Sequence, residues 1–385
     1  MAPARRGLAS AAGTLKTAVF DEHKALGGKM VDFAGYYLPL QYNAGVKSEV
    51  EQTRKAATLF DVSHMGQVKI HGPDRVKFLE SLVVGDIEAL AVGNSQLSLL
   101  TNEKGGIIDD TVITKETDFV GMVINGACKH KDLKHMQEQL ASSGFDAAIE
   151  HLEDKALFAL QGPKAAEVLS TLVEGVDLSS MLFMTSKPAK VAGLDCVLTR
   201  CGYTGEDGFE VSVDNANATA LMQALLNNAV VSPAGLGARD TLRVEAGLCL
   251  YGQDIDETTT PIEGTLLWTI GKRRRAEGGF LGAEVILDQI KNKPARKRVG
   301  FVIHGAPARS HTQLFDKEDG ETPVGEITSG TFSPILGKPV AMGFIDKALA
   351  KSGTDVFAKV RNKMIPAKVS KMPFVPANYY RGPGN

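Results

Sequence analysis

The chain has 385 residues, of which 43% are hydrophobic and 23% are charged, and its formal net charge is −2. This length and composition predict a globular protein of two or three domains with ample core material. The near-neutral charge argues against a general binder of nucleic acid or of membrane surfaces. The sequence contains no run of about twenty apolar residues, so no membrane span is predicted. The four cysteines lack CxxC spacing, so we interpret them as reduced, mostly buried thiols and expect neither a zinc site nor a disulfide framework.

The N-terminal residues 1–14 are basic: they include Arg5 and Arg6, and no acidic residue occurs before Asp21. This composition predicts a short leader for targeting to an organelle, or the remnant of one, with an untargeted tail as the alternative. Residues 15–26 are then expected to form a short helix that ends at the Gly-Gly pair 27–28.

His64 lies between a charged helix expected over 48–57 and an alternating strand expected over 67–71. The neighbouring Asp61 invites a catalytic interpretation, but Ser63 is the only nucleophile close to the pair. We therefore expect His64 to be a hydrogen-bonded structural histidine.

An internal repeat relates residues 70–83 to residues 160–173. Each copy has the pattern of a strand, a Gly-Pro pair with proline at the first helical position, and an amphipathic helix. Each copy is followed by a strand, a glycine-rich turn and a strand with an acidic residue, which is Asp110 in the first copy and Glu210 in the second. The repeat predicts two related α+β units that present one acid each, at corresponding hairpins, to a shared cleft.

The stretch 101–113 combines a polar Gly-Gly turn with an apolar, β-branched strand that is interrupted by two adjacent acids. Successive side chains of a strand point to opposite faces, so Asp110 is expected beside Ile108 and Val112, and Asp109 on the other face. A carboxylate on an apolar face is costly unless it is paired, hydrogen-bonded or protonated. Asp110 is therefore a candidate for a shifted pKa and for catalysis. The alternative is that both acids only tie down the turn.

Residues 233–248 begin as a glycine-rich loop and continue as a helix with Arg239 and Arg243 on one face. A dinucleotide-binding loop is rejected because the third glycine of that fingerprint is missing. Two guanidinium groups near the start of a helix favour an anionic ligand. The alternative is that both arginines pair with local acids such as Asp240 and Glu245.

The remainder of the chain contains a basic run, a group of short strands and an aromatic tail. The four consecutive cations 272–275 are expected to be exposed, and they follow Trp268 closely. They either steer an acidic partner, with the tryptophan as an anchor, or are ordinary surface charge. From about residue 294, strand-like segments between Gly, Pro and Asn turns predict a small β-barrel domain. Tyr379 and Tyr380 follow this domain and could reach back over a neighbouring site.

Six longer motifs carry a family resemblance. They are residues 29–35 (Lys-Met-Val-Asp-Phe-Ala-Gly), 60–65 (Phe-Asp-Val-Ser-His-Met), 105–110 (Gly-Gly-Ile-Ile-Asp-Asp), 202–210 (Gly-Tyr-Thr-Gly-Glu-Asp-Gly-Phe-Glu), 236–243 (Leu-Gly-Ala-Arg-Asp-Thr-Leu-Arg) and 326–334 (Glu-Ile-Thr-Ser-Gly-Thr-Phe-Ser-Pro). With these motifs the chain resembles the aminomethyltransferase (T-protein) family of the glycine cleavage system over residues 15–380.

The resemblance implies an α+β fold in which three domains form a cloverleaf around a central folate cavity. On that basis, residues 1–14 are a leader, residues 15–280 are the folate-binding region, and residues 290–385 are a C-terminal β-barrel domain. The folate-binding region would consist of two interleaved α+β units, one over about 63–146 and the other formed by 15–62 together with 147–280.

The reaction implied by the resemblance moves the one-carbon unit of an aminomethyl group from the lipoyl arm of the carrier H-protein to tetrahydrofolate. Its products are 5,10-methylenetetrahydrofolate, ammonia and the reduced lipoyl arm. The implied partners are the lipoylated H-protein and, as components of the system, the P- and L-proteins; no metal, nucleic acid or membrane is implied. The implied location is the mitochondrial matrix, or the cytoplasm if the chain is bacterial.

The family's catalytic aspartate matches Asp110. Its folate-binding and pocket positions match Glu210, Arg239, Tyr379, Asn125 and Tyr203. A carboxylate suits the donor pair of a pterin ring, a guanidinium suits the carboxylates of the folate tail, and a tyrosine packs well on an aryl ring. Asp110 could accept a proton from the folate nitrogens or stabilise a cationic iminium, and the sequence leaves both roles open.

Two other groups of proteins share parts of these motifs. The folate-dependent halves of sarcosine and dimethylglycine dehydrogenases come with a large flavin domain, for which 385 residues without a dinucleotide fingerprint leave no space. A related folate-binding factor that assists iron–sulfur assembly is not expected to keep the full motif set. The aminomethyltransferase interpretation is therefore preferred.

Overall fold

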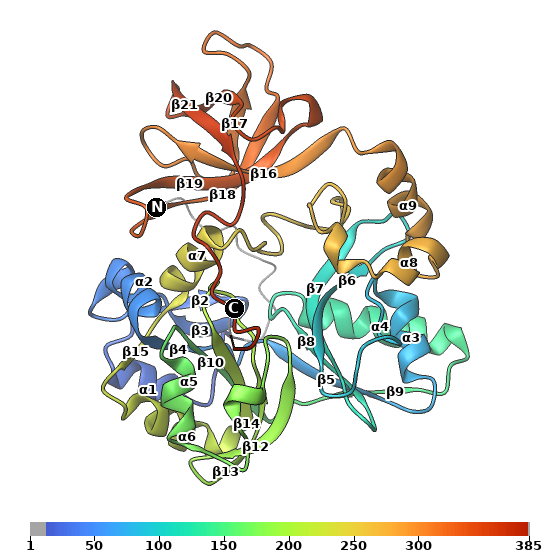
Figure 1. The fold of residues 1–385 in the computed structure, drawn as a ribbon, viewed down its shortest axis with the longest axis vertical. Coiled ribbons are helices and arrows are strands. Elements are labelled where there is room, and N and C mark those ends of the chain that lie inside the picture. The colour runs from blue at the N-terminus through green and yellow to red at the C-terminus, as the bar shows by residue number, and fades with distance from the viewer. Residues whose placement is uncertain (1–12, 384–385) are drawn as a thin grey trace.

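Residues 13–383 are described by the computed structural model, so most of the predicted leader, residues 1–12, lies outside the described part of the chain. The described chain forms three lobes around a common centre (Figure 1). One lobe contains a five-stranded sheet, the second contains a seven-stranded and a small three-stranded sheet, and the third is a closed barrel. The predicted α+β fold with a C-terminal β-barrel is thus confirmed. The residue boundaries of the three predicted domains stay a prediction.

The first lobe is built on a sheet with the strand order β6-β7-β8-β5-β9. Its strands are β5 (Gly66–His71), β6 (Ser95–Thr101), β7 (Ile107–Lys115), β8 (Val120–Ile124) and β9 (Ala148–His151). Helices α3 (Arg75–Leu82) and α4 (Lys129–Ser143) pack on this sheet, and their Phe78, Leu79 and Met136 side chains are fully buried in its core. The apolar positions of these helices therefore fix one face of the strand that carries Asp109 and Asp110.

The second lobe is built on a sheet with the order β11-β12-β13-β14-β10-β4-β15. Its strands are β4 (Ala57–Asp61), β10 (Lys155–Gln161), β11 (Val173–Glu174), β12 (Ser186–Val191), β13 (Leu194–Thr199), β14 (Gly208–Asp214) and β15 (Val231–Pro233). Four helices cover it: α2 (Gly45–Lys55), α5 (Ala165–Ser170), α6 (Ala218–Leu226) and α7 (Leu236–Glu245). Along β10, Phe158 and Leu160 pack toward α5 and α6, whereas Leu157 and Ala159 pack toward α2 and α7. This alternation places α7 on the opposite face of the sheet from α5 and α6.

The barrel closes in the order β16-β19-β18-β17-β20-β21. Its strands are β16 (Arg296–Ile303), β17 (Thr312–Phe315), β18 (Gly325–Ser333), β19 (Lys338–Asp346), β20 (Asp355–Val360) and β21 (Lys363–Ser370). The small sheet contains β1 (Leu15–Lys16), β2 (Met30–Phe33) and β3 (Tyr36–Pro39), and α1 (Phe20–Ala25) follows β1, so residues 15–26 are not one continuous helix. Helix α9 (Ala283–Asn292) leads into the barrel. No helix in residues 13–383 has both the length and the apolar character needed to cross a membrane.

The two copies of the internal repeat are visible as β5 followed by α3 and β10 followed by α5. The glycine between strand and helix has a φ of +97° at Gly72 and +130° at Gly162. A Cβ would meet a backbone oxygen at 2.4 Å in the first copy and 2.3 Å in the second. Any other residue would be strained and would clash at these two turns, so the same glycine serves both units.

The two acids of the repeat do not lie on corresponding strands, and that part of the prediction is wrong. The orders β6-β7-β8-β5 and β12-β13-β14-β10 align β7 with β13 and β8 with β14. Asp110 lies on β7 and Glu210 lies on β14, so the acids are one strand apart in the two units. The short strand β11 lies between α5 and β12 in the second copy, and its counterpart in the first copy is an isolated bridge between Val83 and Leu100.

The predicted alternation along β7 also breaks at one position. Leu100 pairs with Asp109 but Thr101 pairs with Ile107, so the register skips Ile108. Such a bulge turns a side chain away from its expected face. Ile108 therefore packs in the core of the first lobe with Ile113 and not beside Asp110.

The basic run 272–275 belongs to helix α8 (Lys272–Glu277) and is not the exposed cluster that the sequence suggested. Arg273 forms ion pairs with Glu80 at 2.6 Å and with Asp86 at 2.8 Å. The other two arginines donate hydrogen bonds to backbone carbonyl oxygens, and Lys272 is the exposed member. The run therefore joins α8 to the first lobe and does not provide a free docking surface for an acidic partner.

Candidate active site

A cavity of about 860 Å³ lies where the three lobes meet. This is within the size range of small-molecule sites. Its wall contains all six residues selected from the sequence, which are Asp110, Asn125, Tyr203, Glu210, Arg239 and Tyr379. They come from β7, from the loops that follow β8 and β13, from β14, from α7 and from the C-terminal tail. The fold thus brings together side chains that are up to about 270 residues apart in the chain.

Asp110 and Asp109 lie on opposite faces of β7, and Asn125 connects them around the strand. The Asn125 side-chain amide donates to Asp110 Oδ1 at 3.1 Å and to Asp109 Oδ1 at 2.9 Å. The backbone N–H of Asn125 donates to Asp109 Oδ2 at 3.0 Å. Asp109 is fully buried, whereas Asp110 is partly exposed and borders the cavity. Only Asp110 is therefore placed to touch a ligand in the cavity.

The protonation of Asp110 is shifted into the physiological range. Burial raises the pKa of Asp110 to about 7, and the negative charge of Asp109 adds to the shift. The hydrogen bond from Asn125 acts in the opposite direction. A carboxyl group with a pKa near 7 can both take up and release a proton at neutral pH, which suits acid–base chemistry.

Glu210 and Arg239 form a second polar region of the cavity. Burial raises the pKa of the Glu210 carboxyl, while the nearby Arg239 guanidinium and the Cys201 thiol act to lower it. Burial lowers the pKa of Arg239, and its guanidinium lies over the Tyr203 ring at 4.6 Å from the ring centroid. Nη1 of Arg239 is buried without a hydrogen-bond partner in the described part of the chain. An unpaired buried donor is costly, so Arg239 is poised to bind an acceptor that a ligand supplies.

The other two acids in the motif 202–210 are already paired. Glu206 forms an ion pair with Arg54 at 2.8 Å, and Asp207 forms one with Arg200 at 2.5 Å. These pairs hold the loop before β14 in place. They leave the Glu210 carboxylate free to face the cavity.

Arg239 and Arg243, which share one helical face by spacing, have different environments. Arg243 is fully buried and bonds to Asp240 at 2.9 Å, to Ser329 at 2.7 Å and to Asp254. The local-acid alternative is therefore correct for Arg243, with Asp254 in place of the expected Glu245. Arg239 alone of the two borders the cavity.

Two tyrosines shape the apolar part of the wall. Tyr203 donates its hydroxyl to the backbone oxygen of Cys249, which fixes its ring under Arg239. Tyr379 stacks on Phe183 with ring centroids 4.1 Å apart and an interplanar angle of 16°. The tail that carries Tyr379 runs from the barrel to the second lobe (Figure 1), where the N–H of Asn378 donates to Gly205 O at 2.7 Å.

Two further cavity residues have roles that differ from, or go beyond, the sequence interpretation. His64 is buried and lines the cavity, but its Nδ1 finds no hydrogen-bond partner within residues 13–383, so the expected hydrogen-bonded role is wrong for this atom. Burial lowers the pKa of His64 to about 3, so the ring is neutral at physiological pH. Trp268 also borders the cavity and is 62% exposed, which places an apolar ring at its rim.

One cluster of potential metal ligands exists in the part of the chain that the structure describes. It consists of Asp109, Cys128 and Asp132, whose ligand atoms lie within 4.8 Å of one another. None of the three borders the cavity, because they lie on the far side of β7 from Asp110. The four cysteines are all buried and free, as the sequence predicted.

Comparison with known proteins identifies relatives of this fold. A family model described as "GCVT N-terminal domain" matches residues 19–274, and one described as "Glycine cleavage T-protein C-terminal barrel domain" matches residues 296–376. The chain is 50% identical over 376 residues to "Aminomethyltransferase, mitochondrial" of Dictyostelium discoideum, covering 94% of this chain and 93% of that protein. It is 51% identical over 370 residues to the protein of the same name from Homo sapiens, covering 95% and 91%. A crystal structure of glycine cleavage system aminomethyltransferase T from Bartonella henselae superposes with a TM-score of 0.90 at 38% identity, covering 96% of this chain and 100% of that one.

Proposed function

The chain belongs to the aminomethyltransferase (T-protein) family of the glycine cleavage system, and we propose that it carries out this reaction in the cavity between its three lobes. The family transfers a one-carbon unit to tetrahydrofolate. The observation that supports this site is the convergence of Asp110, Glu210 and Arg239 on one cavity. These groups supply an acid–base carboxyl, an acceptor for paired N–H donors and a donor for an acceptor group of the ligand.

Asp110 is proposed as the catalytic residue. As a carboxylate it accepts a proton from each of the two folate nitrogens that bond to the aminomethyl carbon. One proton leaves on ammonia as the C–N bond breaks, and the other goes to the lipoyl sulfur as the C–S bond breaks. Its negative charge also stabilises the iminium cation that forms on the one-carbon unit. Both roles require the ionised form, so the activity should fall as the pH drops through the Asp110 pKa of about 7.

Glu210 and Arg239 are proposed to bind tetrahydrofolate. Glu210→Ala removes a half-buried acceptor that borders the cavity, and Arg239→Ala removes a donor whose Nη1 finds no partner among the described residues. We expect each change to weaken tetrahydrofolate binding by about 1.5–3 kcal/mol, the contribution of a hydrogen bond to a charged group. Isothermal titration calorimetry measures this directly. Asp214→Ala is the control, because Asp214 is an exposed acid on the same strand β14 and lies outside the cavity wall. Unchanged affinity in both cavity variants would contradict the assignment.

The carrier of the aminomethyl group is proposed to be the lipoylated H-protein, which acts together with the P- and L-proteins of the system. Its lipoyl arm must enter the cavity from outside, past the rim where Trp268 is exposed. An exposed aromatic ring at the mouth of a site is a favourable anchor for a partner.

Trp268→Ala is therefore expected to raise the KM for the loaded carrier about tenfold, which corresponds to about 1.4 kcal/mol. Steady-state kinetics with aminomethyl-loaded H-protein tests this. Phe332→Ala is the control, because Phe332 is also exposed, at 48%, but lies outside the cavity wall. Equal KM values for both variants would show that Trp268 does not contact the carrier.

The location of the protein is proposed from its relatives. The proteins from Dictyostelium discoideum and Homo sapiens are both named as mitochondrial. The basic residues 1–14 have the composition of a targeting leader. We therefore propose the mitochondrial matrix as the location of this chain.

The proposed reaction is tested by one assay. Purified protein is mixed with aminomethyl-loaded lipoyl carrier, with and without tetrahydrofolate, and the release of ammonia is measured. Fast ammonia release that depends on tetrahydrofolate, with formation of methylenetetrahydrofolate, is expected. Release at the same rate without tetrahydrofolate would contradict the proposal.

A further inference from the structure

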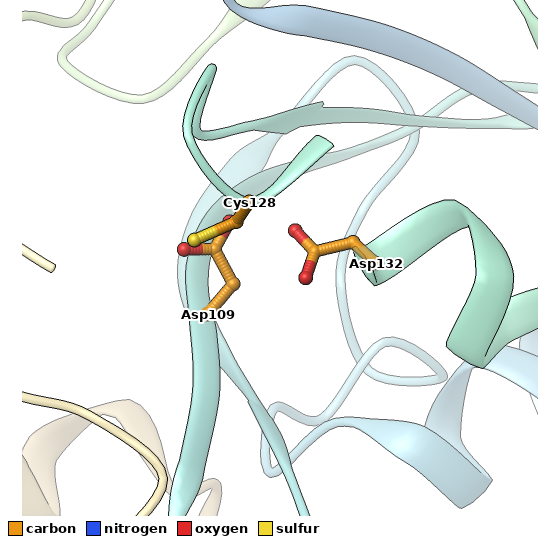
Figure 2. Close-up of side chains that lie close together, drawn as sticks. All are labelled: Asp109, Cys128 and Asp132. Atoms are coloured by element: carbon orange, nitrogen blue, oxygen red, sulfur yellow. The ribbon is translucent and has the colours of Figure 1, made fainter. Parts of the chain in front are cut away.

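Three buried side chains behind the cavity wall form a polar cluster that the reaction as described does not use. They are Asp109 on β7, Cys128 directly before α4 and Asp132 in the first turn of α4. Figure 2 shows the Asp132 carboxylate pointing from its helix toward Asp109 and Cys128 on the neighbouring segments. Asp109 and Asp132 are both completely buried. Two adjacent buried carboxylates are unexpected, because burial removes a carboxylate from bulk water.

The two carboxylates differ in their hydrogen-bond donors. Asp109 accepts two N–H groups from Asn125, at 2.9 Å and 3.0 Å. No N–H or hydroxyl group of the described residues reaches either oxygen of Asp132. N–H donors stabilise an ionised carboxylate, and a buried carboxylate without them is stable only when it holds a proton. The geometry therefore assigns the negative charge to Asp109 and a proton to Asp132.

The charged and titratable groups around the cluster agree with this assignment. Lys131 is the nearby cation on α4, but its ammonium group is bound to Ile108 O at 2.7 Å, to the Tyr251 hydroxyl at 2.7 Å and to Glu257 at 3.1 Å. It lowers the pKa of Asp132 less than burial and Asp109 raise it.

The pKa values of Asp132 and Cys128 are both raised, which fits a neutral carboxylic acid and a neutral thiol. Burial, followed by the charge of Asp109, raises the pKa of Asp132 to about 10. The same two causes raise the pKa of Cys128 above its usual range. Asp110 lies on the opposite face of β7, and its charge raises the pKa of Asp132 further.

We propose that Asp132 is a positioning residue of the active site: its carboxylic acid donates a hydrogen bond to Asp109 and keeps Asp109 as a fixed negative charge behind Asp110. The proton stays on Asp132 throughout, so no bond forms or breaks there during the reaction. Asp109 in turn acts on Asp110, directly as a like charge and through the Asn125 amide that both carboxylates accept. The proposal rests on the proposed role of Asp110 as catalytic residue.

Two substitutions of similar size separate this role from the alternatives. In Asp132→Asn the side-chain amide replaces the carboxylic acid as a neutral donor to Asp109. We expect its turnover and its pH profile to remain close to those of the parent protein. In Asp132→Leu the hydrogen-bond donor is lost, so Asp109 is no longer held in place beside Asn125 and its effect on Asp110 weakens. The acid limb of kcat/KM should then move to lower pH by about one unit, the effect of losing a near like charge.

The kinetic outcomes that would overturn the proposal are distinct. If Asp132 were ionised, both variants would remove a charge near Asp110, and both would shift the acid limb by the same amount. If Asp132 only packed against its neighbours, both variants would lower stability and neither would shift the acid limb. If Asp132 were a metal ligand, elemental analysis would find a stoichiometric divalent ion in the parent protein that Asp132→Asn has lost.

A spectroscopic readout separates this proposal from the proposed function. Infrared difference spectra of the protein without substrates, recorded at pH values where ordinary carboxyl groups are ionised, should show the carbonyl stretch of a buried carboxylic acid. This band should disappear in Asp132→Asn and persist in Asp110→Asn. A missing band in the parent protein would overturn the role of Asp132. A present band with full activity in Asp110→Asn would instead overturn only the role of Asp110.

Discussion

Asp110→Asn is expected to lower kcat by roughly 10²-fold or more, the usual effect of losing a group that acts in acid–base or electrostatic catalysis. Asparagine keeps the size of the side chain but can neither accept a proton nor supply negative charge. The Asp110 carboxyl has its pKa raised to about 7 by burial and by Asp109, so it can serve both purposes at neutral pH. Single-turnover measurements with loaded carrier and tetrahydrofolate report the chemical step directly.

Asp109→Asn is the matched control for this experiment, because it makes the same chemical change one residue away on the opposite face of β7. Asp109 lies outside the cavity wall and touches no space that a ligand can enter. Its substitution should lower kcat much less than Asp110→Asn, and it should shift the acid limb of the pH profile to lower values because a like charge near Asp110 is removed. Equal losses of kcat in two folded variants would show that the strand faces do not separate the two roles.

The features of the site that could be predicted from the sequence are those that depend on neighbours in the chain. The period of two in a strand separated Asp109 from Asp110, and the Gly-Gly turn before them marked the hairpin. The bulge at Ile108 could not be predicted, because it depends on how β6 pairs with β7 and on the core that receives the isoleucine side chain. The local pattern therefore separated the two acids of β7 correctly but did not predict how the strand packs.

The charged groups were harder to interpret, because their partners are far away in the sequence. Four consecutive cations look exposed when only their own repulsion is considered, but Arg273 meets Glu80, which lies 193 residues earlier. His64 illustrates the opposite case: it looked like a structural residue, yet its Nδ1 has no partner in the described residues. The partner of Arg273, and the lack of one for His64 Nδ1 among the described residues, both depend on how the lobes are arranged, which the local sequence does not show.

The loss of Asp254 is expected to lower the stability of the fold strongly. It bonds to Arg243 on α7, and it accepts hydrogen bonds from Thr328 and Ser329 on β18, so it joins the second lobe to the barrel. The Arg243 and Asp254 side chains are 1% and 0% exposed. Without Asp254, the buried Arg243 guanidinium keeps only the half-exposed Asp240 as an acidic partner among the described residues, and breaking a buried ion pair costs about 3–5 kcal/mol.

Asp254→Ala should therefore lower the free energy of unfolding by about 3–5 kcal/mol, measured by urea titration followed by circular dichroism. Asp240→Ala is the matched control, because Asp240 bonds to the same guanidinium at 2.9 Å but is 48% exposed. Its loss should cost less than about 1 kcal/mol, since a half-exposed ion pair is screened by water and Arg243 retains its buried partner. If the two variants were equally stable, burial would not determine the strength of these pairs. A larger loss of stability for Asp254→Ala than for Asp240→Ala would show that the buried carboxylate contributes more to the contact between α7 and the barrel than the half-exposed one does.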